Sequence, residues 1–340
     1  MRKIFQKENH SGTVLILVLW SLTLLTVFAV HIGLRVRGKV DLLSRLDKRD
    51  RSAAIAESCI AKAISILNTK FKIEGKLISD AAFKKVRFNN PEAFQEIKID
   101  QGTCSINYRN YGVGSEKKFG ITDEERKINI NTASHDVLKS IIQIATPLKE
   151  EMASNLALAI IDWREYGSSQ VEGFYSDAFY ENLEFPYKEK KRSFEILDEL
   201  LLVRGVNQKL YDQLRDFITI YGTGKVNINT ASKPVLLALG LSAGAVNKML
   251  IARRGPDRVD ATEDDYIFEH FSSLEALIGL VNLTRKELRE LDLVYGRQEM
   301  GMLSAYYGIQ ADVDYRGETR HVECVYSRND GKIIYWREKL

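Results

Sequence analysis

The sequence predicts an α+β fold in which a long N-terminal helix packs on an antiparallel sheet, interrupted by a large all-helical inserted domain. Three observations predict it. A helical pattern without proline runs over residues 13–67. Residues 301–340 read as short strands, with strict alternation of apolar and polar residues over 307–315. Helical spacing fills the segment 128–300 between them. With 340 residues the chain has room for two or three modules and a sizeable core.

The N-terminus carries a membrane-length apolar segment. Residues 13–34 have no charged side chain, and about twenty apolar residues suffice to cross a bilayer. The basic segment 2–7 before them predicts a cytoplasmic N-terminus. The small residue Gly12 precedes the apolar run, whereas a secretory signal has small residues after a shorter run. We therefore expect a leader over residues 1–12, cleavage between Gly12 and Thr13, and a transmembrane helix; an uncleaved anchor is the alternative.

The helical pattern does not stop at the membrane. Ile55, Cys59, Ala63 and Ile66 keep helical spacing, so one helix of roughly 80 Å is expected to run directly into a domain. We assign residues 35–127 to this helix and the first strands of the sheet.

The segment 128–300 is assigned to an inserted helical domain, and its pattern is helical from Thr132 to about Gly296. The predicted helices cover residues 134–144, 150–164, 194–203, 208–217, 233–239, 243–253, 272–280 and 285–291. After residue 300 the period changes to two, which predicts antiparallel strands over 307–315, 319–326 and 332–336. These strands need a partner face, and the amphipathic half of the N-terminal helix can supply it.

One motif occurs twice. Residues 127–134 read KININTAS and residues 225–232 read KVNINTAS. A short strand followed by Asn-Thr-Ala-Ser is a strand-to-helix junction, at which we expect Asn131 or Thr132 to cap the first helix. Asn229 or Thr230 is expected to cap the second. Such junctions introduce helix-hairpin-helix-like units, which often bind nucleic acid.

Charge and glycine content argue against nucleic acid. The segment from Ile128 to Met300 holds 20 Lys/Arg and 26 Asp/Glu, a net charge of −6, whereas phosphate binding rests on clustered Lys and Arg. The hairpins also lack the paired glycines that let a backbone approach phosphate closely. Arg253 and Arg254 form the one basic pair placed to help. A membrane-anchored helix-hairpin-helix DNA receptor is therefore the alternative function, and no nucleic acid is expected.

The three cysteines, Cys59, Cys104 and Cys324, have no Cys-x-x-Cys spacing and form no disulfide framework. We expect three small buried apolar residues, with a Cys104–Cys324 pair as the alternative in an oxidising compartment.

Several segments, taken in order, resemble one family. They are Gly12 with the apolar helix and its Leu19-Trp20, the repeated motif, residues 158–164 ending in Trp163-Arg164, and the segments 179–187, 194–206, 210–221 and 333–338. Their order and spacing resemble the minor pseudopilin K family of the type II secretion system, also called general secretion pathway protein K. The resemblance covers nearly the whole chain.

The resemblance implies a pseudopilin fold and a role at the tip of a periplasmic pseudopilus. The implied partners are the minor pseudopilins I and J, other pseudopilus and inner-membrane secretion components, and the prepilin peptidase that would cleave after Gly12. The implied protein is non-enzymatic and single-pass in the inner membrane, with a periplasmic domain. Residues 301–340 would complete the pseudopilin domain around the insert.

One residue supports the tip role on physical grounds. If Thr13 is the first mature residue, the fifth is Leu17. Most pilins carry Glu there, whose carboxylate compensates the terminal ammonium of a neighbouring subunit inside the membrane, where a lone charge is costly. The first subunit of a filament has no subunit above it to compensate, so it can dispense with this acid.

The family resemblance also implies calcium in the inserted domain. Calcium takes several carboxylate and carbonyl oxygens, and Glu165, Glu172 and Asp177 remain as ligands in a stretch where other family acids are neutral. A solvated polar loop is the alternative. The second acidic stretch over residues 257–265 is expected to be a surface charge run.

The sequence contains no pattern for catalysis. Its five histidines form no metal-ligand pair at helical spacing, and it has neither a phosphate-binding Gly-Lys loop nor a Gly-x-Ser-x-Gly elbow. The aromatic residues Trp163, Phe179, Tyr180 and Tyr187 are expected to be core.

Overall fold

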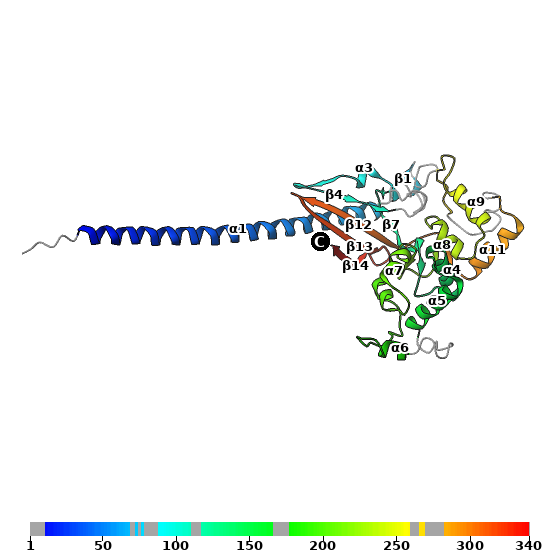
Figure 1. Ribbon diagram of the computed structural model, residues 1–340. Coiled ribbons are helices and arrows are strands. Elements are labelled where there is room, and N and C mark those ends of the chain that lie inside the picture. Colours follow the sequence, from blue (N-terminus) through cyan, green and yellow to red (C-terminus); the bar gives the residue numbers. More distant parts are fainter. Residues whose placement is uncertain are drawn as a thin grey trace, which may run out of the picture.

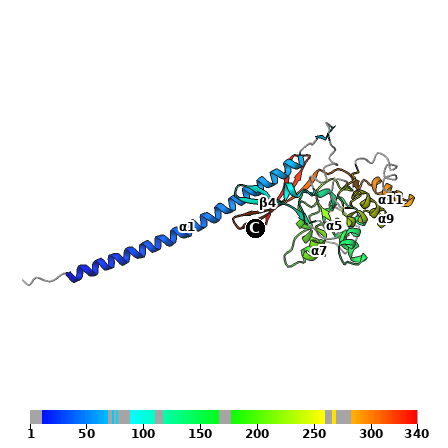
Figure 2. The same cartoon turned by 90° about the horizontal axis from the view of Figure 1, so that it is seen from above.

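The computed structural model describes residues 11–68, 72–73, 76–77, 88–109, 117–165, 177–258, 265–268 and 282–339. One helix, α1 (Ser11–Asn68), projects far out of the body and then continues along a sheet (Figures 1 and 2). This confirms the single helix predicted over residues 13–67. At 1.5 Å per residue, its 58 residues span roughly 87 Å. Its N-terminal part is long and apolar enough to cross a membrane.

The sheet is antiparallel and has six strands. Its order is β14-β13-β12-β4-β3. β4 pairs with the C-terminal half of β12, and β7 pairs with Tyr307 and Gly308 near the N-terminal end of β12. The long strands are β12 (Tyr306–Tyr315), β13 (Glu318–Ser327) and β14 (Lys332–Lys339), which confirms the three strands predicted near the C-terminus. The short ones are β3 (Ile97–Ile99), β4 (Gly102–Ile106) and β7 (Thr122–Asp123).

The second half of α1 packs on this sheet. Ile55, Ala56, Ile60 and Leu67 are buried, because apolar side chains at helical spacing face the inward residues of β4, β12 and β13. The same core takes in Ile309 and the other alternate residues of β12. By contrast, the apolar side chains of α1 from Val14 to Leu46 are exposed in the isolated chain.

Small elements surround this core. They are β1 (Lys72–Ile73) paired with β2 (Lys76–Leu77), α3 (Pro91–Phe94), β5 (Tyr108–Arg109) paired with β6 (Lys117–Lys118), and the 3₁₀ turn η2 (Glu124–Arg126).

Between β7 and β12 lies a segment with two cores of its own, at the end of the molecule away from the projecting helix (Figure 1). Its helices are α4 (His135–Ala145), α5 (Glu150–Arg164), α6 (Asp177–Glu181), η3 (Leu197–Leu202), α7 (Gln208–Leu214), α8 (Lys233–Ala238), α9 (Ala243–Arg253) and α11 (Arg285–Gly296). The helices predicted over 150–164 and 243–253 match α5 and α9. The one predicted over 272–280 lies outside the described residues.

The expectation that this segment is all-helical is wrong. β8 (Ile128–Asn129) pairs in parallel with β9 (Ile218–Thr219), and β10 (Val226–Asn227) pairs in parallel with β11 (Met300–Gly301). Each pair joins the start of a helical unit to its end. β8 and β10 are the short strands expected at the start of the two repeated motifs, whereas β9 and β11 have only two residues each, too few for an alternating pattern, and were not expected.

The helix predicted over residues 194–203 is also shorter than expected. Only η3 forms, as a 3₁₀ helix. The backbone N–H and C=O of Phe194 are both bonded to the Asn131 side chain, so a helix cannot use them. The N–H groups of Glu195 and Ile196 donate to the Glu199 carboxylate at the start of η3.

Candidate functional site

The two copies of the repeated motif build the same local structure. In the first, the Asn129 side-chain oxygen accepts from the N–H of Asn131 at 2.9 Å; in the second, Asn227 accepts from Asn229 at 3.0 Å. The helix that follows begins with a different residue than predicted. Ser134 is the N-cap of α4, and its Oγ accepts from the N–H of Val137 at 3.4 Å.

The predicted caps therefore need correction. The equivalent N-cap of α8 is Ser232. None of the four predicted residues is the N-cap of the helix that follows it: Asn131, Thr132, Asn229 and Thr230. The side chains of Asn131 and Asn229 instead form hydrogen bonds to the backbone of a residue much later in the chain. This long-range role competes with capping.

Each asparagine holds one phenylalanine by both backbone groups. Asn131 donates to the C=O of Phe194 at 3.0 Å and accepts from its N–H at 2.7 Å. Asn229 does the same with Phe268, at 2.9 and 2.8 Å. Both phenylalanines are buried in the core of their own unit. The motif thus fastens a later part of each unit to its beginning.

An arginine at the end of the second helix completes each unit. Arg164 donates to the C=O groups of Ile130 and Ala133 at 2.5 and 2.8 Å, and Arg253 donates to those of Ile228 and Ala231 at 3.1 and 2.7 Å. Both arginines are buried. Burial lowers the pKa of Arg164, and its hydrogen bond to Glu165 acts in the opposite direction.

This use of Arg253 bears on the nucleic-acid alternative. The guanidinium group of Arg253 is buried and donates hydrogen bonds to two backbone carbonyl groups of its own unit. Residues 253–254 therefore do not offer a pair of guanidinium groups to a phosphate backbone. The repeated motif thus forms hydrogen bonds within its own unit and stabilises the fold of that unit.

A buried carboxylate joins the helical units to the sheet. Asp123, at the end of β7, accepts hydrogen bonds from Asn227 at 3.0 Å, Thr230 at 2.5 Å and Ser304 at 2.7 Å, and from the N–H of Glu125. It therefore ties the chain entering the units to the chain leaving them. Burial raises the pKa of Asp123 to about 6, although the bonds from Thr230 and Ser304 act in the opposite direction.

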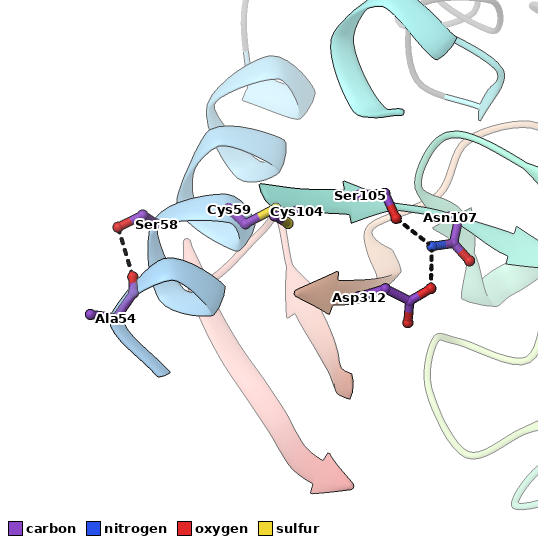
Figure 3. The surroundings of a disulfide bond; sticks show 7 residues. All are labelled: Ala54, Ser58, Cys59, Cys104, Ser105, Asn107 and Asp312. Atoms are coloured by element: carbon purple, nitrogen blue, oxygen red, sulfur yellow. Dashed lines mark hydrogen bonds between the residues drawn. A yellow bond between two sulfur atoms is a disulfide. The ribbon is translucent and has the colours of Figure 1, made fainter. Parts of the chain in front are cut away.

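A disulfide fastens α1 to the sheet. Cys59 of α1 is bonded to Cys104 of β4, with their Cα atoms 6.5 Å apart (Figure 3). The expectation of three unpaired cysteines is therefore wrong, and so is the alternative pair Cys104–Cys324. Cys324 is buried as a free thiol in the same core. Helix α1 crosses the sheet so that residue 59, and not residue 324, meets β4.

Comparisons with known proteins find a family resemblance for the first helical unit. Residues 124–223 match the family model described as "Type II secretion system (T2SS), protein K". This stretch coincides with the first unit, which runs from β8 to β9. Residues 124–223 are therefore similar to the type II secretion system protein K family. A curated relative, the type II secretion system protein K of Aeromonas hydrophila, is 38% identical over 90 residues, which are 26% of this chain and 27% of the relative.

The fold resemblance extends much further than this match. A chain in the crystal structure of the GspK-GspI-GspJ complex from the type 2 secretion system of enterotoxigenic Escherichia coli superposes with a TM-score of 0.55. The match covers 90% of this chain and 99% of that one at 14% identity. At this identity the resemblance establishes the shared fold, and with it the mixed helix and antiparallel sheet described above.

Of the aromatic residues predicted to be core, Trp163 and Tyr180 are buried, and Phe179 and Tyr187 are partly buried and pack against the same core. Trp163, Tyr180 and Phe194 are buried, and the Trp163 ring lies 5.7 Å from that of Tyr180 and 6.4 Å from that of Phe194 between centroids. Burial raises the pKa of Tyr180 to about 12. These rings are packed against one another, so they do not form an open cage.

The predicted calcium ligands are only partly described. Glu165 follows α5 and its carboxylate contacts Arg164 at 2.9 Å. Glu172 lies outside the described residues, and Asp177 is described only as the first residue of α6. Within the described part of the chain, no group of three His, Cys, Asp or Glu side chains is arranged to hold a metal ion. A calcium site at these three positions stays a prediction.

The predicted processing site lies at the far end of α1. Gly12 and Thr13 are in its first turns, and a Cβ added at Gly12 would meet nothing within 4 Å. Leu17 is 69% exposed, as a side chain facing lipid or a neighbouring helix would be. Nothing in the isolated chain tests cleavage.

Proposed function

We propose that this chain is a minor pseudopilin of the type II secretion system, anchored in the inner membrane by α1 with its body in the periplasm. The observation that carries the proposal is the continuity of α1. The helix leaves a membrane-length apolar segment and, without a break, becomes part of the core between Ile55 and Leu67. A helix of this kind links the membrane rigidly to the domain, which a subunit that is lifted out of a bilayer into a filament requires.

The processing that we propose follows from the same helix. Prepilin peptidase would cleave after Gly12 and leave Thr13 as the first residue, with Leu17 as the fifth. Without an acid at the fifth position, the subunit has no carboxylate to compensate the terminal ammonium of a neighbouring subunit. We therefore place it at the tip, where no subunit lies above it.

The proposed partners are the minor pseudopilins I and J. The support is the fold shared with a chain of the solved GspK-GspI-GspJ complex. The exposed apolar side chains of α1, from Val14 to Leu46, offer a continuous helical surface for neighbouring pseudopilin helices. We infer no catalytic activity, since the buried polar groups described above are engaged in hydrogen bonds that hold the fold.

We also propose that α4–α5 and α8–α9 are two helix-hairpin-helix-like units used as a scaffold. The DNA-receptor alternative is not favoured, because the guanidinium groups of Arg164 and Arg253 are buried against backbone carbonyls. The units instead present a folded body at the end of the molecule opposite the membrane segment (Figure 1).

Mass spectrometry tests the processing step. When the full chain is produced with a prepilin peptidase and extracted from membranes, its mass should correspond to loss of residues 1–12. Gly12→Leu is the matched control, because the position has space for a side chain and the variant should keep its leader. An intact leader in the wild-type chain, or cleavage beyond His31, would contradict the assignment.

Co-purification tests the partners. The full chain, co-expressed with pseudopilins I and J of its own system and extracted in mild detergent, should bring down both. Co-expression with the major pseudopilin alone is the comparison for non-specific association of apolar helices. Recovery of the chain without I and J, under conditions in which I and J recover each other, would refute the tip assembly.

A further inference from the structure

A short basic cluster directly follows the membrane-length segment of α1. Residues 13–34 carry no charged side chain. The next charged residues are Arg35, Arg37 and Lys39, which we call the basic collar. The first acid after the collar is Asp41. Membrane orientation does not explain the collar, because basic residues favour the cytoplasmic side and the proposed orientation puts the collar on the other side.

The basic collar has no partner in the folded body. It lies on the part of α1 that projects out of the body, and its three side chains are exposed (Figures 1 and 2). The first residue of α1 described as buried is Ser52, roughly 20 Å along the helix from Lys39. Among the described residues, the ion pairs of α1 are those of Arg51, and none involves the collar. The charges of the collar are therefore left to groups outside the body of this chain.

The length of the apolar segment sets the collar at the level of lipid phosphates. At 1.5 Å per residue, residues 13–34 span roughly 33 Å, slightly more than the hydrocarbon core of a bilayer. The collar begins at the next residue, where the headgroup layer begins. Arg and Lys side chains extend their charged ends into this layer while their methylene groups stay in the apolar region.

The three collar residues surround the helix. The backbone of α1 is helical without a break here, and successive residues of an α-helix are turned by about 100°. Arg35 and Lys39 therefore lie on one side, about 40° apart, and Arg37 lies on the opposite side. A single protein helix packed against α1 would cover one side only, whereas lipid headgroups surround a membrane helix. The arrangement favours lipid as the partner.

We propose that the basic collar binds the phosphate groups of anionic phospholipids in the leaflet where the membrane segment of α1 ends. Guanidinium groups bind phosphate oxygens in pairs, and one Arg or Lys near an anionic membrane surface gains roughly a fivefold increase in affinity. The bound lipids hold the end of the membrane segment at a fixed depth, so α1 must release them when it leaves the bilayer. This inference rests on the proposed membrane anchoring and does not depend on the partners of the chain.

Competition between two lipids tests the proposal. The full chain, extracted in mild detergent, is mixed with equal amounts of phosphatidylglycerol and phosphatidylcholine, and native mass spectrometry identifies the lipids that stay bound. We expect the wild-type chain to retain phosphatidylglycerol over phosphatidylcholine roughly tenfold or more at low salt. High salt screens the charges and should remove most of this preference. The collar variant, with Arg35→Gln, Arg37→Gln and Lys39→Gln together, should retain the two lipids equally.

Two controls separate the collar from net charge. Lys48→Gln, Arg49→Gln and Lys62→Gln together remove the same number of positive charges further along α1, and this variant should keep the preference of the wild-type chain. Arg35→Lys with Arg37→Lys keeps the charges of the collar and should keep the preference as well.

Equal lipid preference in the wild-type chain and the collar variant would overturn the proposal and leave the collar to an acidic protein partner. An equal loss in the variant with the three distant substitutions would also overturn it. Flotation with vesicles of pure phosphatidylcholine tests the anchoring separately, since the wild-type chain and the collar variant should both float and resist alkaline extraction. A chain that does not float refutes the anchoring, whereas a chain that floats without preferring phosphatidylglycerol refutes the lipid-binding collar alone.

Discussion

Cys59→Ala should lower the free energy of unfolding of the sheet domain by about 4 kcal/mol. The cysteines are 45 residues apart, and closing a loop of that length restricts the unfolded chain by this amount in the chain-entropy treatment of disulfides. The bond also joins α1 to β4, and both elements contribute to the core of the sheet domain. Denaturant unfolding of the detergent-extracted chain, followed through Trp336 in β14, measures the loss.

Cys324→Ala is the matched control. This substitution also removes one sulfur atom from the core but breaks no covalent bond between elements, so it should lower the free energy of unfolding by roughly 1 kcal/mol. A reductant should bring the wild-type chain close to Cys59→Ala and leave Cys59→Ala unchanged. Equal losses in the two variants would mean that the disulfide contributes only the volume of its atoms.

Cys324 should not exchange with the disulfide. The thiolate is the attacking form of cysteine, and burial raises the pKa of the Cys324 thiol to about 12. The third cysteine therefore stays a thiol in a folded chain even though it shares a core with the bonded pair.

The elements that could be predicted from the sequence are those with a long local signal. Helix α1 has a helical pattern without proline over residues 13–67, and apolar and polar residues alternate over residues 307–315 of β12, so neither depends on a distant contact for recognition. The repeated motif was also visible, and it does mark junctions where a strand meets a helix.

The roles of particular side chains could not be predicted in the same way. Asn131 is a good N-cap by type, but its partner is Phe194, 63 residues later, and that contact decides its orientation. Ser134 could have been identified as the cap, since serine is equally favoured there and directly precedes the helix. The Cys59–Cys104 pair depends on how α1 lies on β4.

Asp123 governs the second large effect, a dependence of stability on pH. It is buried, and its pKa is about 6 in the folded chain against an ordinary value of 3.8. Between these values the folded state binds the proton more tightly than the unfolded state, so this group's contribution to stability is full below about pH 4. It is lost as the pH rises through about 6, by roughly 3 kcal/mol in all.

Asp123→Asn should remove this dependence. The amide keeps the shape of the carboxyl group and cannot ionise, so the stability of the wild-type chain relative to the variant should fall by roughly 3 kcal/mol between pH 4 and pH 7. Asp314→Asn, at an exposed position of β12, is the control and should leave the pH profile of the wild-type chain unchanged. Parallel profiles for the wild-type chain and Asp123→Asn would contradict the prediction.

Asp123→Asn also tests the hydrogen bonds that Asp123 accepts at the junction of the sheet and the helical units, apart from the effect of its charge. Thr230 and Ser304 carry hydroxyl groups that can reorient towards an amide, whereas Asn227 and the N–H of Glu125 can only donate from their present positions. Asp123→Asn should therefore weaken the junction at every pH, in addition to removing the pH dependence. Hydrogen exchange at Glu125 and Ala305, which flank the entry and exit of the units, should accelerate in Asp123→Asn and stay slow in Asp314→Asn.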